Sequence, residues 1–140
     1  MSKQTQQDVK EEVEQPKLSP ILDGNIRIFR YMYRNREDQK FVEWQIDVYI
    51  HNAQQQGSIL YHTRWERLMG VIDEIEKDEL ISSVTVSGKG TVIRFKNGNS
   101  TDIFVKVSAE VDKKEACWRT IVNYMHFLEK QKAKEEKKKK

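Results

Sequence analysis

The chain has 140 residues, of which 37% are hydrophobic and 34% are charged, and its formal net charge is +3. This length predicts one domain, and the absence of any apolar run near the roughly 18 residues that cross a bilayer excludes a membrane-spanning chain. A lone cysteine, Cys117, cannot form an internal disulfide, and residues 1–20 lack the apolar segment of a secretory signal, so we expect an intracellular protein, cytoplasmic or nuclear.

The excess positive charge lies at the C-terminal end of the chain. Residues 129–140 hold seven lysines and three glutamates, whereas residues 21–128 hold 15 basic and 15 acidic residues and residues 1–20 sum to −1. The first segment has little to bury, and the last is a low-complexity lysine run. We therefore predict a disordered tail over 1–20, a single α+β domain over 21–128, and a Lys-rich tail over 129–140 that extends the last helix.

Two β-strands are predicted at the start of the domain. Residues 25–35 are rich in β-branched and aromatic side chains. In residues 40–50, apolar and mostly polar positions alternate, with Val42, Trp44 and Ile46 on one face. A period of two is typical of a half-buried strand, and the polar residues 36–39 suit a loop, so we expect an N-terminal β-hairpin.

An amphipathic helix is predicted next. Thr63 and Glu66 have the spacing of a capping box, in which each side chain satisfies a free backbone amide. The apolar residues that follow recur every three or four positions, to about Asp78. Gly70 lies within this stripe, where a missing side chain would permit close packing on a sheet.

Three short strands and a second helix complete the predicted domain. We expect strands over 81–87, 91–96 and 101–107, the last two joined by Asn97-Gly98, a pair that strongly favours a hairpin turn. Asp112 begins a second amphipathic helix. The predicted fold class is α+β, in the order β-β-α-β-β-β-α, with an antiparallel sheet and two amphipathic helices packed on one face.

The residue patterns favour binding over catalysis. The three histidines do not pair at metal-ligand spacing, and a single cysteine gives no zinc pattern. On the predicted strand, Glu43 and Asp47 would lie roughly 13 Å apart, too far for a two-carboxylate acid–base pair. We expect no enzyme, no catalytic residue, no metal site and no cofactor.

Basic and aromatic residues concentrate on the predicted strands. Cations hold phosphates while aromatic rings stack bases, which is a sequence-tolerant way to bind single strands. We predict a nucleic-acid-binding sheet face made of Arg27, Phe29, Arg30, Tyr31, Arg34, Lys89, Arg94, Lys96, Phe104 and Lys106.

The leading functional hypothesis is a small non-enzymatic protein that binds single-stranded DNA or RNA through this face, with affinity added by the Lys-rich tail. The alternative is a protein–protein interaction adaptor or a structural homo-oligomer, assembled through a sheet edge or apolar helix faces. A homodimer that binds nucleic acid would combine the two.

Two segments resemble known nucleic-acid-binding families. Residues 59–75, with Thr63 and Trp65, resemble the Trp-bearing helix of small single-stranded-DNA-binding coactivator domains. The order helix, three strands, then a helix start at 112–115 is similar to a double-stranded-RNA-binding domain, in which paired lysines contact phosphates. Both resemblances imply nucleic acid as the partner, and neither identifies a family.

Overall fold

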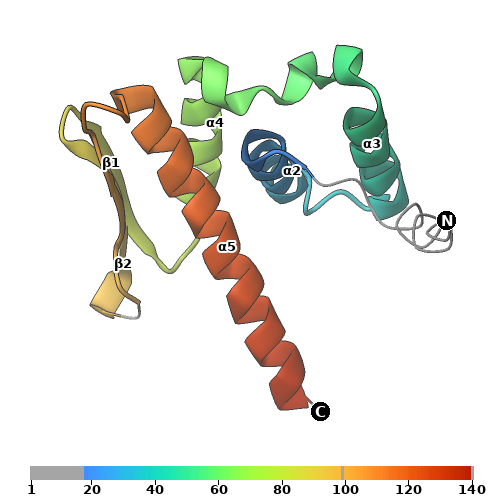
Figure 1. The fold of residues 1–140 in the computed structure, drawn as a ribbon. Coiled ribbons are helices and arrows are strands. Elements are labelled where there is room, and N and C mark those ends of the chain that lie inside the picture. The colour runs from blue at the N-terminus through green and yellow to red at the C-terminus, as the bar shows by residue number, and fades with distance from the viewer. Residues whose placement is uncertain (1–17, 99, 140) are drawn as a thin grey trace, which may run out of the picture.

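A computed structural model describes residues 18–98 and 100–139, and these form a mixed α and β structure (Figure 1). The helices are α2 (Pro20–Met32), α3 (Gln39–His51), α4 (Trp65–Ile75) and α5 (Lys113–Lys139). The strands are β1 (Ile81–Ser87), β2 (Gly90–Phe95) and β3 (Ile103–Lys106), and they form one antiparallel sheet in the order β1-β2-β3. Short 3₁₀ turns cover Ala53–Ile59, Tyr61–Thr63 and Lys96–Gly98. The predicted α+β class with an antiparallel sheet is confirmed.

The N-terminal hairpin predicted over residues 25–35 and 40–50 is wrong, because α2 and α3 occupy both segments. Ser19 caps α2 by accepting a hydrogen bond from the Leu22 N–H at 3.1 Å, and Pro20 stands in the first turn, where its missing N–H costs nothing. Asp38 caps α3 by accepting from the Phe41 N–H at 3.1 Å. The predicted order β-β-α-β-β-β-α is corrected accordingly.

The apolar pattern of residues 40–50 fits a helix as well as a strand. The buried side chains of α3 are Val42, Ile46 and Tyr49, which recur every three or four residues. Trp44, which a strand would place on the same buried face as Val42, is 58% exposed. The helix therefore buries a different set of side chains from the one that alternation predicted.

The elements predicted from Thr63 onward are present, with one change in capping. Thr63 lies in a 3₁₀ turn and donates its hydroxyl to the Leu60 carbonyl at 2.8 Å, so the predicted capping box with Glu66 does not form, and α4 has no side-chain cap. Asp112 does cap α5, accepting from the Glu115 N–H at 2.8 Å. The predicted disorder of the N-terminal tail falls mainly on residues 1–17, which lie outside the described residues.

Helix α5 is the central element of the fold. It packs against all three strands on one side and against α2 on another, so that it lies between the sheet and the N-terminal helices (Figure 1). Ile121 and Tyr124 of α5 and Ile93 of β2 are fully buried in the shared core. The opposite face of the sheet, which we call the open face, presents Arg94, Phe104 and Lys106, all exposed in the part of the chain that the structure describes.

A buried polar bridge ties the start of α2 to α5. The Trp118 Nε1–H donates to Asn25 Oδ1 at 2.8 Å, and the Asn25 amide nitrogen lies 3.0 Å from His62 Nδ1. An indole N–H can only donate, which fixes the Asn25 amide so that its NH₂ group donates to His62. The His62 Nδ1 atom is therefore unprotonated and the ring is neutral, in line with the lowering of the His62 pKa by burial.

Within the described part of the chain, no helix is long and apolar enough to cross a membrane.

Candidate nucleic-acid interface

The structure divides the ten predicted site residues between two surfaces. Arg27, Phe29, Arg30 and Tyr31 lie on α2, and Arg34 lies in the turn that follows it; together we call them the α2 group. Lys89, Arg94, Lys96, Phe104 and Lys106 belong to the sheet or its turns. Because α5 packs against both α2 and the sheet, it separates the two groups. The single basic sheet face predicted from the sequence is therefore not assembled.

The two aromatic residues of the α2 group are buried. Phe29 is 7% exposed and meets the Tyr49 ring edge-on at 5.4 Å, and Tyr31 is 8% exposed and meets the Tyr124 ring at 6.1 Å. Burial raises the pKa of the Tyr31 hydroxyl. Neither ring has a face free to stack on a base, so the prediction that they do so is wrong.

The first two arginines of α2 bind carboxylates of α2 itself and of the neighbouring helices. Arg30 donates to both oxygens of Glu43 on α3 at 3.0 Å, and this hydrogen bonding raises the pKa of Arg30 and lowers that of Glu43. Arg27 binds Asp23 at 2.9 Å within α2 and also binds Glu129 of α5. These guanidinium groups link α2 to α3 and α5.

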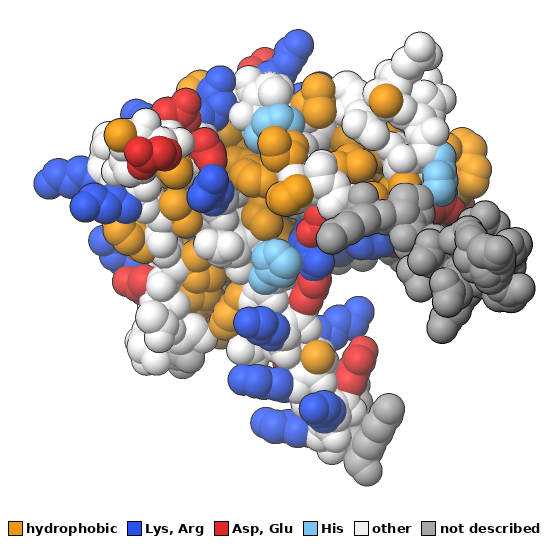
Figure 2. Space-filling view, in the orientation of Figure 1, with side chains coloured by type: hydrophobic (Ala, Val, Ile, Leu, Met, Phe, Trp, Pro, Cys, Tyr) orange, Lys and Arg blue, Asp and Glu red, His pale blue; other side chains and the backbone are white. Residues whose placement is uncertain are grey.

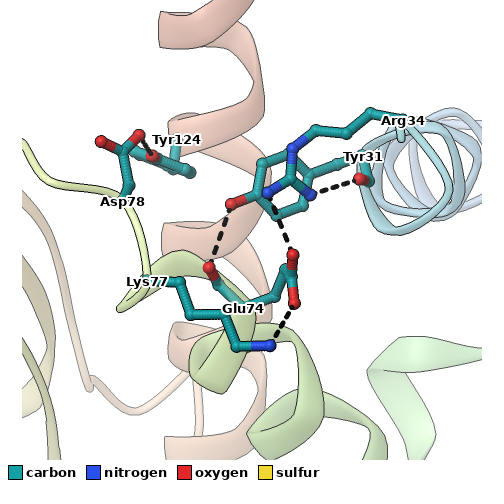
Figure 3. Close-up of polar contacts among 6 residues, drawn as sticks. All are labelled: Tyr31, Arg34, Glu74, Lys77, Asp78 and Tyr124. Atoms are coloured by element: carbon teal, nitrogen blue, oxygen red, sulfur yellow. Dashed lines mark hydrogen bonds and ion pairs between the residues drawn. The ribbon is translucent and has the colours of Figure 1, made fainter.

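Arg34 belongs to a polar cluster that joins α2 to the end of α4 (Figure 3). It donates to Glu74 Oε2 at 3.0 Å and to the Tyr31 carbonyl at 2.8 Å, and its guanidinium lies 4.0 Å from the centre of the Tyr31 ring. Lys77 binds the other oxygen of Glu74 at 3.2 Å. Hydrogen bonding to Lys77 and Arg34 lowers the pKa of Glu74. The Arg34 guanidinium is therefore already bound to the Glu74 carboxylate, which a phosphate would have to displace.

The α2 arginines line a groove between α2, α3 and α5 with a volume of about 510 Å³. Lys132 of α5 adds a fourth cation to its wall. Each arginine in this groove has a carboxylate partner among the described residues. An added anion would have to displace those carboxylates, so the groove is a weak candidate for phosphate.

The open face of the sheet is a better candidate. Phe104 is 54% exposed and stands opposite Val92 of β2 in the strand register, while Lys106 stands opposite Gly90. Gly90 has a φ of 151°, and a Cβ built there would lie 2.8 Å from the Phe104 ring and 2.4 Å from the Val105 carbonyl oxygen. The missing side chain at Gly90 thus leaves room for the Phe104 ring over the neighbouring strand.

The basic side chains near Phe104 form fewer ion pairs with carboxylates than the arginines of the α2 group do. Arg94 Nε lies 3.8 Å from Asp102, a long contact between two half-exposed side chains. Lys89 in the β1–β2 turn, Lys96 in the 3₁₀ turn after β2, and Lys106 make no ion pair with any residue that the structure describes. Residues 89–106 contain four basic side chains and one acidic one, and Arg94 and Lys106 share the sheet face of Phe104.

Lysines also gather on the C-terminal half of α5, which extends beyond the rest of the fold (Figures 1 and 2). At 100° per residue, Lys130, Lys134, Lys137 and Lys138 fall within an arc of about 100° on one side of the helix. All four are exposed, and none is ion-paired within the described range. This side of α5, which we call the lysine stripe, is free to contact an anionic polymer.

Phe41 and Trp44 on α3 form an exposed aromatic pair that the sequence interpretation missed. Phe41 is 41% exposed, Trp44 is 58% exposed, and their ring centres are 5.7 Å apart. Their spacing of three residues places them on the same side of a helix. The three-residue spacing is visible in the sequence, but the alternation of residues 40–50 predicted a strand, which would place the two rings on opposite faces.

Two features bear on the metal and thiol chemistry of the described residues. Over residues 18–98 and 100–139, no three side chains of His, Cys, Asp or Glu come together as metal ligands. Cys117 is buried, and burial raises the pKa of its thiol to about 11, so it stays protonated and is a poor nucleophile. The paired lysines at the start of α5 already have contacts within the protein. Lys114 donates a hydrogen bond to the Thr63 carbonyl at 3.2 Å, and the Lys113 ammonium group lies 6.0 Å from the centre of the Trp65 ring.

Comparison with known proteins adds no relative. No protein-family model, no curated protein and no solved structure matches this chain.

Proposed function

We propose that this protein binds single-stranded nucleic acid on the open face of its sheet. The observation that carries the proposal is the Phe104 ring, which is 54% exposed, lies close to the Gly90 backbone, and shares its sheet face with Arg94 and Lys106. An exposed ring on a rigid strand loses little entropy when a base stacks on it, and base–aromatic stacking contributes about 1–3 kcal/mol per base.

The cations determine how the backbone of the strand is held. Arg94 and Lys106 lie on the same face as Phe104, and Lys89 lies at the turn that ends this face. Phosphates that replace condensed counterions around these side chains gain affinity that weakens with added salt. A single ring with flanking cations has no base-edge hydrogen-bonding pattern, so the expected binding is tolerant of sequence.

The lysine stripe of α5 supplies a second, purely electrostatic contribution. It carries no aromatic ring, and its four lysines contact phosphate only. We expect it to raise the affinity for longer oligonucleotides more than for short ones, because a short strand on the sheet does not reach it. Removing residues 129–140 should lower affinity and salt dependence without abolishing binding to the sheet.

The test is a salt titration of binding to fluorescently labelled single-stranded DNA and RNA, followed by anisotropy. Replacing Lys89, Arg94 and Lys106 together by glutamine should weaken binding and reduce the slope of log affinity against log salt by about 2, at roughly 0.7 per lost phosphate contact. The matched control replaces Arg27, Arg30 and Arg34 by glutamine, which should lower stability and leave the slope unchanged. Equal affinity and slope in the Lys89/Arg94/Lys106 variant and the wild type would refute the proposal.

A second candidate function, protein–protein interaction, is favoured by the Phe41–Trp44 pair. Two large rings in contact on an exposed helix face are typical of the apolar centre of an interface. Trp44→Ala should then abolish capture of a protein partner while leaving oligonucleotide binding intact. A wild-type chain that binds no protein and does bind oligonucleotides would exclude this function in favour of the first.

A further inference from the structure

Strand β1 is an edge strand without the features that usually protect edges from pairing. It is outermost in the order β1-β2-β3, and Ile81–Ser87 contains no charged residue and no proline. Natural edge strands are commonly short, charged or interrupted by proline, because their free N–H and C=O groups otherwise pair with another strand. The opposite edge, β3, has four residues, ends in Lys106 and follows Asp102.

Among the described residues, no strand pairs with the outer side of β1. Apart from Ile81, its residues are half-buried or exposed. Beyond its ladder with β2, the only backbone hydrogen bond from β1 within the described residues joins the Ile81 N–H to the Asp78 carbonyl at 3.0 Å. The outward N–H and C=O groups of the strand are thus available to a further strand.

We propose that β1 pairs antiparallel with β1 of a second copy of this chain, about a two-fold axis at Val84. This register places Val84 opposite Val84 of the second copy, and Ser83 opposite Thr85. No like charges meet along the strand, because β1 carries none. Val84 and Val86, which are half-buried at the sheet edge, would be covered by β-branched or small neighbours.

Charges at the two ends of β1 identify the partner as a second copy. Glu79 lies five residues before Val84, and Lys89 lies five residues after it. Both side chains are exposed, and neither forms an ion pair within the described part of the chain. The two-fold pairing brings the turn that holds Glu79 of each copy next to the hairpin turn that holds Lys89 of the other, so that an exposed carboxylate and an exposed ammonium group of opposite charge meet at each end of the paired strands.

The irregularity of β1 is compatible with this register. The ladder with β2 shifts between Ile81 and Ser83 and is regular from Ser83 to Ser87, so Val84 lies in its regular part. Pairing would join two sheets into one, with the charged β3 strands at both outer edges. The open faces of the two sheets would then be continuous, which extends the surface available to a nucleic-acid strand.

The first test measures self-association by sedimentation velocity over a concentration series of nuclease-treated protein. We expect reversible dimers in the wild type. Glu79→Lys should weaken dimerisation by about tenfold or more, because it brings one lysine close to Lys89 of the other copy at each end of the pair, and Lys89→Glu should do the same by bringing two carboxylates together. The double variant Glu79→Lys/Lys89→Glu should recover wild-type dimerisation, since it restores opposite charges.

The second test fixes the register by cross-linking the full chain. Val84→Cys places the two thiols opposite each other, within reach of an intermolecular disulfide under mild oxidation. Ser87→Cys is the control, because its two thiols would lie roughly 20 Å apart in this register. Native Cys117 is buried and does not compete. A wild type that stays monomeric up to about 1 mM, a dimer indifferent to the charge reversals, or equal cross-linking at the two positions would each overturn the proposal.

Discussion

Gly24 and Gly70 both lie inside helices, yet replacing each by alanine should have opposite effects. Alanine is favoured over glycine in a helix interior by about 1 kcal/mol. At Gly70 of α4, nothing lies within 4 Å of an added Cβ, so Gly70→Ala should raise the free energy of unfolding by about 0.5–1 kcal/mol. The close packing expected at Gly70 from the sequence is absent.

At Gly24 of α2, an added Cβ would lie 2.6 Å from Trp118 Cζ2 and 3.0 Å from Val122 Cγ2. The Trp118 ring cannot move away freely, because its N–H is held by Asn25 at 2.8 Å. Overpacking of this kind costs about 1–3 kcal/mol, which exceeds the gain in helix propensity. We expect Gly24→Ala to lower the free energy of unfolding by about 1–2 kcal/mol and the melting temperature by roughly 5 °C.

The assay is urea denaturation of both variants and the wild type, followed by far-UV circular dichroism. The slope against urea should be the same in all three proteins, so that the midpoints report stability. Gly24→Ala at or above wild-type stability would show that the α2–α5 contact is looser than described.

Two further predictions concern other polar groups. Burial lowers the pKa of His62 in the folded state, so the unfolded chain binds a proton at His62 more tightly than the folded protein does. Neutral His62 therefore contributes to the free energy of unfolding above about pH 6.5, and this contribution is lost as the pH falls through the lower pKa of the folded state. His62→Gln should therefore flatten the change in urea midpoint between about pH 7.5 and pH 5.5, and an unchanged pH profile would contradict the Asn25–His62 assignment. Arg34→Met should lower the melting temperature, because it removes the link to Glu74, yet leave oligonucleotide affinity within about twofold; loss of affinity without loss of stability would instead place Arg34 at the interface.

The half of the fold after residue 60 could be predicted because its signals are local. Asn97 and Gly98 both have positive φ, 56° and 67°, and lie in the connection between β2 and β3. That connection spans residues 96–102, so it is longer than the two-residue hairpin loop that an Asn-Gly pair favours. The stripe that begins at Trp65 has a helical period and no competing one. In the first half, residues 40–50 fit periods of two and of about 3.6, and the β-branched composition of 25–35 favoured the wrong choice. The caps at Ser19 and Asp38 were the signals that could have decided it.

The candidate site could be predicted only for residues that do lie in strands, where alternate residues face the same side of the sheet. Arg94, Phe104 and Lys106 were expected on one face and lie on the open face of the sheet. The α2 arginines could not be separated from them by sequence, because their partners Glu74 and Glu129 are distant along the chain. Whether an arginine is free for phosphate or bound to a carboxylate depends on tertiary contacts that composition does not contain.

The most direct test of the nucleic-acid hypothesis is the affinity of the Phe104→Ala variant for a labelled single-stranded oligonucleotide. The proposal predicts a loss of about 1–3 kcal/mol, which is roughly 5- to 150-fold, with an unchanged salt slope, since no charge is removed. Phe104→Tyr should retain the affinity, and Trp44→Ala, which removes a ring of similar exposure on α3, should have no effect. Wild-type affinity in a folded Phe104→Ala protein would contradict the proposal that the open face of the sheet is the binding surface.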